Sequence, residues 1–274
     1  MTMLCNKQFF LATLILPVLL IAIEAANAEA LSADYLSAES VIDFNSYDFG
    51  GGVLLIKEGA STFTTGSTIT GFFQTYVNSH QLNGVGVSNP TLNNTGSGTG
   101  YELTMVADFS AKITNASLPG FFGFELESGE ASLYLDKSPD YSFTADFGFD
   151  NGEEILSSQD VAGSGFISSF GFGVVNVDFF SSSIINKSVY GDVEIAAASA
   201  IFALDANNLE QINGVTTVAG NSVGASDFLF AVDGGLKLSK ASNIVATPLP
   251  LSVWLFGSAM ISLVSFRCRK GGGV

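Results

Sequence analysis

Cysteine, histidine, tryptophan and arginine are almost absent from the central part of this 274-residue chain. The two cysteines, Cys5 and Cys268, lie near the ends, so residues 31–247 have neither a disulfide nor a thiol nucleophile. The single histidine, His80, cannot build a zinc site of the His/Cys type, and any catalytic triad would have to use it as its base. Because His80 stands in a polar stretch, we interpret it as a surface residue of a loop.

Positive charge is scarce in the same region. Residues 31–247 hold 24 Asp and Glu against six Lys and no Arg, a formal net charge of −18. Such a surface repels nucleic acid and anionic lipid, and it attracts divalent cations and basic partners. Nucleic acid is therefore excluded as a partner, although part of the acidity can serve solubility alone.

The N-terminus reads as an export signal. An uncharged apolar run at 9–23 is followed by small residues that offer two A-x-A cleavage sites, which end at Ala28 and Ala30. An uncleaved anchor helix is the alternative, but Pro17 and the polar exit favour cleavage. We therefore predict a signal peptide over residues 1–30 and an exported body.

The C-terminus carries a second apolar run. Residues 249–266 contain no charge, and 18 residues at helical rise reach roughly 27 Å, close to the thickness of a bilayer core. Arg267, Arg269 and Lys270 follow at once and are expected to stay on the cytoplasmic side, while Trp254 suits the outer interface. This pattern predicts a single transmembrane helix rather than a core helix of a soluble domain.

Two prolines precede this run. The resulting order resembles the PEP-CTERM sorting signal: Pro248, Leu249 and Pro250 come first, then Trp-Leu-Phe-Gly-Ser within the apolar run, and then the basic cluster. Leu249 stands where the motif has Glu, and Cys268 interrupts the usual basic ending. The resemblance implies that residues 248–274 are read by an exosortase of a Gram-negative bacterium that makes extracellular polysaccharide. It also implies transit through the secretion machinery, transient insertion in the inner membrane and a final place at the cell surface or in the extracellular matrix. A sortase L-P-x-T-G motif is absent, and a GPI signal would not end in basic residues.

Residues 31–247 show strand periodicity and no dividing linker, so we predict one domain. Alternate positions of 101–113 are apolar, as are those of 121–127 and 131–135, with a turn expected at 128–130. The same pattern recurs at 141–149. Gly234 and Gly235 indicate a late hairpin, and the one stretch with helical character is 196–210. With 24 Phe to fill a core and 30 Gly for turns and bulges, we predict an all-β fold, a jelly-roll-like antiparallel β-sandwich.

Parts of this body resemble a second family. The segments 65–71 (TGSTITG), 101–104 (YELT), 129–136 (GEASLYLD) and 147–156 (FGFDNGEEIL) are similar to flocculation-associated PEP-CTERM proteins. That resemblance implies a structural surface protein of flocs or a biofilm matrix, associated with extracellular polysaccharide, with no catalytic residue. The alternatives are a carbohydrate-binding module, with Tyr101 and Tyr134 as stacking platforms, and a matrix glycosidase.

Candidate sites are acidic. Glu125 and Glu127, two apart on one strand, would place their side chains roughly 7 Å apart, within the range of an inverting glycosidase, but two acids on an alternating strand are ordinarily a solvent face. No cofactor is indicated except calcium, for which an oxygen-rich stretch offers ligands, although it departs from the EF-hand loop and can equally be a plain acidic turn. Its candidate ligands are Asp146, Asp150, Asn151, Glu153 and Glu154.

Overall fold

The structure is a computed structural model that describes residues 30–36, 42–57, 63–95, 100–117, 119–179 and 184–240. Ala28 of the signal region and the sorting residues from Pro248 to Lys270 lie outside these ranges. The transmembrane helix that we expected at 249–266 lies outside the described residues. Among the residues that the structure describes, no helix is long and apolar enough to cross a membrane.

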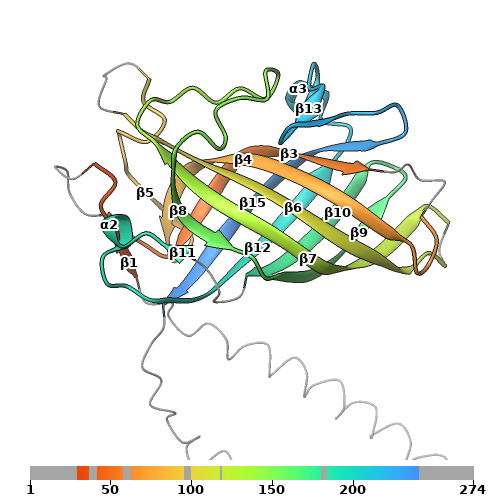
Figure 1. The fold of residues 1–274 in the computed structure, drawn as a ribbon, viewed down its shortest axis with the longest axis horizontal. Helices are drawn as coiled ribbons and strands as arrows, with labels where there is room; N and C mark the ends of the chain where they lie inside the picture. Colours follow the sequence, from red (N-terminus) through yellow and green to blue (C-terminus); the bar gives the residue numbers. More distant parts are fainter. Residues whose placement is uncertain are drawn as a thin grey trace, which may run out of the picture. The chain divides into compact units, whose positions relative to one another are not determined.

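Eight long strands form a closed antiparallel barrel (Figure 1). Around the barrel each strand pairs with the next long strand in the sequence, and the last of them, β15, pairs with the first, β3. The eight are β3 (Ser46–Lys57), β4 (Thr68–Leu82), β6 (Glu102–Asn115), β7 (Phe121–Asp136), β9 (Val161–Ser168), β10 (Phe172–Phe179), β12 (Ile195–Asp205) and β15 (Phe228–Lys240).

The predicted β-sandwich is therefore wrong, although the all-β, antiparallel character agrees with the structure. A jelly roll needs two separate sheets joined by crossing connections. Here neighbouring strands meander, and pairing of β3 with β15 closes one continuous ladder that leaves these eight strands no free edge. A strand with one buried face alternates in the same way in either architecture, which is why periodicity did not separate them.

Shorter elements cover the barrel. β1 (Leu31–Ala33) pairs with β2 (Ile42–Phe44), β5 (Val85–Val87) extends β4, and β8 (Glu153–Ser158) pairs with the second half of β7 and with β11 (Ile184–Ile185). The helix α2 (Lys187–Tyr190) contacts β1. Between β12 and β15 lie α3 (Leu209–Ile212), β13 (Thr217–Val218) and β14 (Asn221–Ser222). Val215 and Val218 of that connection pack on the outer face of β3, so this part of the wall is buried on both faces.

Four local predictions differ from the structure. Residues 128–130 are not a turn, because β7 runs straight through them. Gly234 and Gly235 are not a hairpin turn either: β15 is continuous, and a Cβ on Gly234 would overlap the carbonyl oxygen of Ile201 on β12. Glycine is thus needed at that point for close strand packing beside a bulge.

The helix expected within 196–210 is instead the strand β12, whose alternate residues from Ala198 to Leu204 are buried. The strand expected at 141–149 is a turn-rich connection between β7 and β8. Asp146 and Gly148 there have positive φ angles of 51° and 83°, which a strand does not accommodate.

His80 is not on the surface. It lies in β4 and is fully buried, with its Nε2 atom 3.0 Å from the hydroxyl of Tyr35. The hydroxyl group of Tyr47 lies 2.9 Å from that of Tyr35 and 2.6 Å from that of Tyr190. Phe44 contacts the His80 ring edge-on. Because the cluster includes residues from the N-terminal segment and from α2, it fastens these pieces to the barrel. Burial lowers the pKa of His80 to about 4.

We expect this histidine to make the barrel less stable in mild acid. The unfolded chain binds a proton at His80 below pH 6.5 and the folded chain only below about pH 4, so stability falls as pH drops through that window. Relative to His80→Phe, which keeps the ring packing, the wild type should lose up to about 3 kcal/mol between pH 6.5 and 4. Denaturant unfolding of both proteins across this range measures the difference, and parallel pH profiles would contradict the prediction.

Candidate functional site

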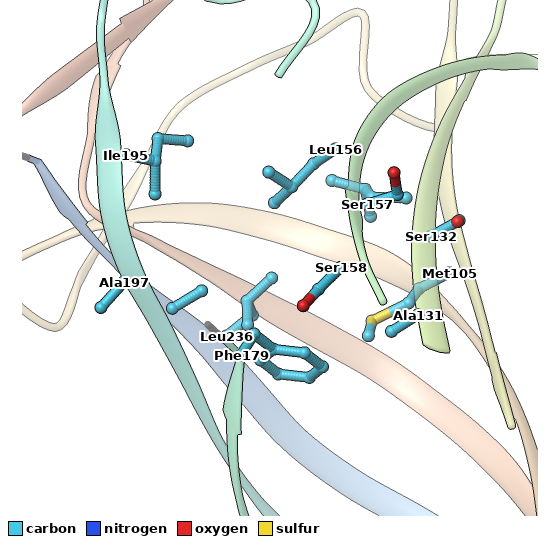
Figure 2. A pocket seen from close by; sticks show the side chains of 12 residues that line it. Met105, Ala131, Ser132, Leu156, Ser157, Ser158, Phe179, Ile195, Ala197 and Leu236 are labelled. Atoms are coloured by element: carbon cyan, nitrogen blue, oxygen red, sulfur yellow. The ribbon is translucent and has the colours of Figure 1, made fainter. Parts of the chain in front are cut away.

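Core side chains occupy the barrel interior. Two apolar cavities among the described residues there measure about 40 Å³ and about 30 Å³. Figure 2 shows the smaller one, where the hydroxyl group of Ser158 points toward Phe179 and Leu236. Eight-stranded barrels can hold a small ligand, but a cavity that admits benzene measures about 150 Å³. Neither of these two cavities is large enough for such a ligand.

An outer hollow of about 160 Å³ lies over β4, β6 and β7. Phe72, Asp108 and Glu130 form one row across these three strands, since Asp108 is the register partner of both others. Ser132 and Tyr134 continue the hollow along β7, and Ala219 of the β12–β15 connection contributes to its lining. The hollow thus combines two aromatic rings with two carboxylates and a hydroxyl group.

Further along the same face of β6 and β7, three acids come together. Glu102 and Asp136 are register partners on the two strands, and Asp140 follows in the β7–β8 connection. One carboxylate oxygen from each lies within 4.8 Å of the others, and no other group of this kind occurs among the described residues. We call these three residues the acidic cluster.

Glu102 is the unusual member of the acidic cluster because it is fully buried. Its Oε2 atom accepts a hydrogen bond from the backbone N–H of Asp140 at 3.1 Å, while Oε1 has no hydrogen-bond partner. Burial raises the pKa of Glu102 to about 7, and the charges of Asp140 and Asp136 add to this rise although backbone hydrogen bonds oppose it. Neither of the ion pairs found among the described residues, Lys57–Asp227 and Lys187–Asp192, involves a member of the acidic cluster.

The β7–β8 connection, residues 137–152, buries Glu102. Tyr141 stacks on Tyr76 of β4 with ring centroids 4.6 Å apart, and the Thr104 hydroxyl donates to the carbonyl of Phe149 at 2.8 Å. These contacts lay the connection over the outward-facing residues of β6. An outward position on an alternating strand thereby becomes a buried one, which is why the sequence pattern did not single out Glu102.

The predicted calcium ligands lie in or beside this connection but do not meet as a group. Asp146 accepts the N–H groups of Ala219 and Gly220 at 3.0 Å and 2.8 Å, and so joins two connections. Asn151 is the member that contacts the acidic cluster, through a hydrogen bond to Asp140 at 3.2 Å. Of the others, Glu153 accepts from Asn186 at 2.6 Å, Glu154 lies 3.5 Å from the Ser132 hydroxyl, and Asp150 is exposed.

The predicted glycosidase and sugar-stacking residues also do not form one site. Glu125 and Glu127 are exposed on the outer face of β7, with Lys112 opposite Glu125. Tyr101 is buried and stacks on Tyr35, so it offers no platform to a ligand. Tyr134 is half-buried and lines the outer hollow.

Comparison of this chain with known proteins found no relative. No protein-family model, curated protein or solved structure matches it. Its function is therefore inferred from its own residues and their arrangement.

We expect Asp146 to stabilise the outer wall. Asp146→Asn keeps the shape and tolerates the positive φ angle, but its NH₂ group cannot accept one of the two N–H groups. The free energy of unfolding should fall by about 1–3 kcal/mol in urea titrations. Asp150→Asn, at an exposed site in the same connection, is the control and should change little. Equal stability of the two variants would contradict the role of Asp146.

Proposed function

We propose that this chain is an exported structural protein of the cell surface or extracellular matrix of a Gram-negative bacterium, sorted by an exosortase and associated with extracellular polysaccharide. The sorting proposal rests on the residues at 248–270. It is also supported by the position of the first described strand: β1 starts at Leu31, directly after the cleavage sites at Ala28 and Ala30. Cleavage at either site would leave every strand that the structure describes intact.

The architecture is compatible with an extracellular protein. A closed barrel presents no free edge along its eight strands for pairing with other chains, and its stability needs no disulfide. The net charge of −18 over residues 31–247 keeps copies apart in dilute solution. Adhesion in a matrix then requires specific contacts with the polymer or cations that bridge the carboxylates.

The outer hollow is the observation that carries the polysaccharide proposal. Tyr134 and Phe72 offer apolar faces, while Asp108, Glu130 and Ser132 offer acceptors for sugar hydroxyl groups. At about 160 Å³ it is smaller than the roughly 300 Å³ of the smallest typical drug-sized sites, so it suits one sugar ring of a polymer. Its two carboxylates repel uronic acids and favour neutral or amino sugars.

Asp108 and Glu130 also support a second candidate function. They are directly opposed on neighbouring antiparallel strands, and glycosidases use a pair of carboxyl groups that flank the scissile bond. A matrix glycosidase therefore stays as the alternative. Release of reducing ends from a polymer that the protein binds would favour it over a structural role.

Mass spectrometry of protein recovered from the cell surface tests the sorting proposal. We expect a mature N-terminus at Glu29 or Leu31, and no peptide that covers residues 254–266. The same host without its exosortase is the control and should retain the intact tail. An intact 254–266 peptide in the extracellular fraction would refute sorting.

Polymer binding by the full chain tests the outer hollow. Tyr134→Ala should weaken retention on neutral or amino-sugar polymers at least about tenfold, because stacking and apolar contact are lost. Phe147→Ala removes an aromatic ring that is 55 % exposed but does not line the hollow, and it should bind like the wild type. If Tyr134→Ala binds as tightly as the control, the polymer contacts another surface.

A further inference from the structure

We propose that Glu102, Asp136 and Asp140 bind one calcium ion, which fastens the β7–β8 connection to the barrel wall. This site is separate from the outer hollow and needs no polysaccharide. Two of its ligands belong to the wall, on β6 and β7, and the third belongs to the connection.

The spacing of the acidic cluster fits a single ion. Calcium binds oxygen at about 2.3–2.6 Å, so two ligands of one ion lie at most about 5 Å apart. The three carboxylate oxygens lie within 4.8 Å of one another, inside that limit. The ion would complete its usual six to eight ligands with second carboxylate oxygens, backbone carbonyl groups or water.

The Glu102 side chain gives independent support. It is fully buried, and its Oε1 atom has no hydrogen-bond partner. An ionised carboxylate in such a place is costly unless its oxygens are paired with donors or a positive charge. The N–H group of Asp140 reaches Oε2, whereas no ion pair of the described residues involves Glu102, Asp136 or Asp140, so a bound cation would supply the counter-charge that Oε1 lacks.

The ligand chemistry selects calcium. The cluster offers carboxylate oxygens, whereas zinc prefers nitrogen and sulfur ligands. Magnesium demands near-ideal octahedral geometry, while calcium accepts irregular sets of oxygen ligands.

Calcium would also stabilise neighbouring parts of the wall. The connection that carries Asp140 also carries Asp146, which holds the N–H group of Ala219. Ala219 lines the outer hollow. An ion at Asp140 therefore supports the same connection that braces one side of the hollow.

Calorimetric titration of the chelator-treated full chain with calcium chloride, in a background of matched ionic strength, tests the site. We expect one saturable site, with weaker binding of magnesium. At a calcium concentration of 100 Kd the melting temperature should rise by roughly 5–10 °C. Absence of a saturable site, or an equal rise with sodium chloride alone, would overturn the proposal.

Variants locate the ion. Glu102→Gln keeps the shape but removes the buried charge, so it should weaken calcium binding at least tenfold and cut the rise in melting temperature at the same calcium concentration to about half or less. Glu127→Gln makes the same change at an exposed position of β7 and should respond to calcium like the wild type. If Glu102→Gln does not fold, Asp140→Asn replaces it with the same expectation. A wild-type calcium response in either cluster variant would refute the site.

Discussion

Strand β7 pairs along both of its edges, and the closure of the barrel depends on this pairing. One edge follows β6 over nearly the whole of β7, while the other edge meets β9 in its first half and β8 in its second half. Residues 128–130 lie between these halves and keep the strand continuous. Had they formed a turn, β7 would be two short strands and the ladder from β6 to β9 would be interrupted. Closure also requires β15 to reach β3, so the first and last long strands fix each other.

The barrel is closed and core side chains occupy its interior, so the candidate ligand sites lie on its outer face. The core side chains leave cavities that are too small for a ligand, whereas two connections fold over the outside of the wall. One of them covers the outer residues of β6 and withdraws Glu102 from water. The outer hollow and the acidic cluster thus lie along one face, because the same pair of strands, β6 and β7, supplies residues to both.

The carboxylate side chains of this protein occur in two arrangements, dispersed over the surface and gathered in the acidic cluster. Most carboxylates are dispersed over the surface, where they are solvated and separated. In the acidic cluster, by contrast, strand register places Glu102 opposite Asp136, and a hydrogen bond from the N–H group of Asp140 to Glu102 brings the third carboxylate to them. The first arrangement gives a general attraction for cations, and the second supports a defined site for one ion. A matrix rich in divalent cations would therefore affect both the contacts between copies and the barrel wall itself.

The sequence by itself determined the β content, the absence of disulfide and thiol chemistry, and the inward face of β6. Alternate residues of that strand from Leu103 to Ile113 pack inward as their period of two requires, since this period is a local property of an extended chain. The sequence pattern could not distinguish a sandwich from a barrel, because closure of the barrel depends on whether β15 pairs with β3. For the same reason Gly234 and Gly235 suggested a turn, while the neighbouring strand β12 makes them a point of close packing. Only the tertiary structure buried His80 and Glu102 and brought Glu102 to Asp136 and Asp140, since burial and ligand spacing are set by segments remote in sequence that fold over the strands.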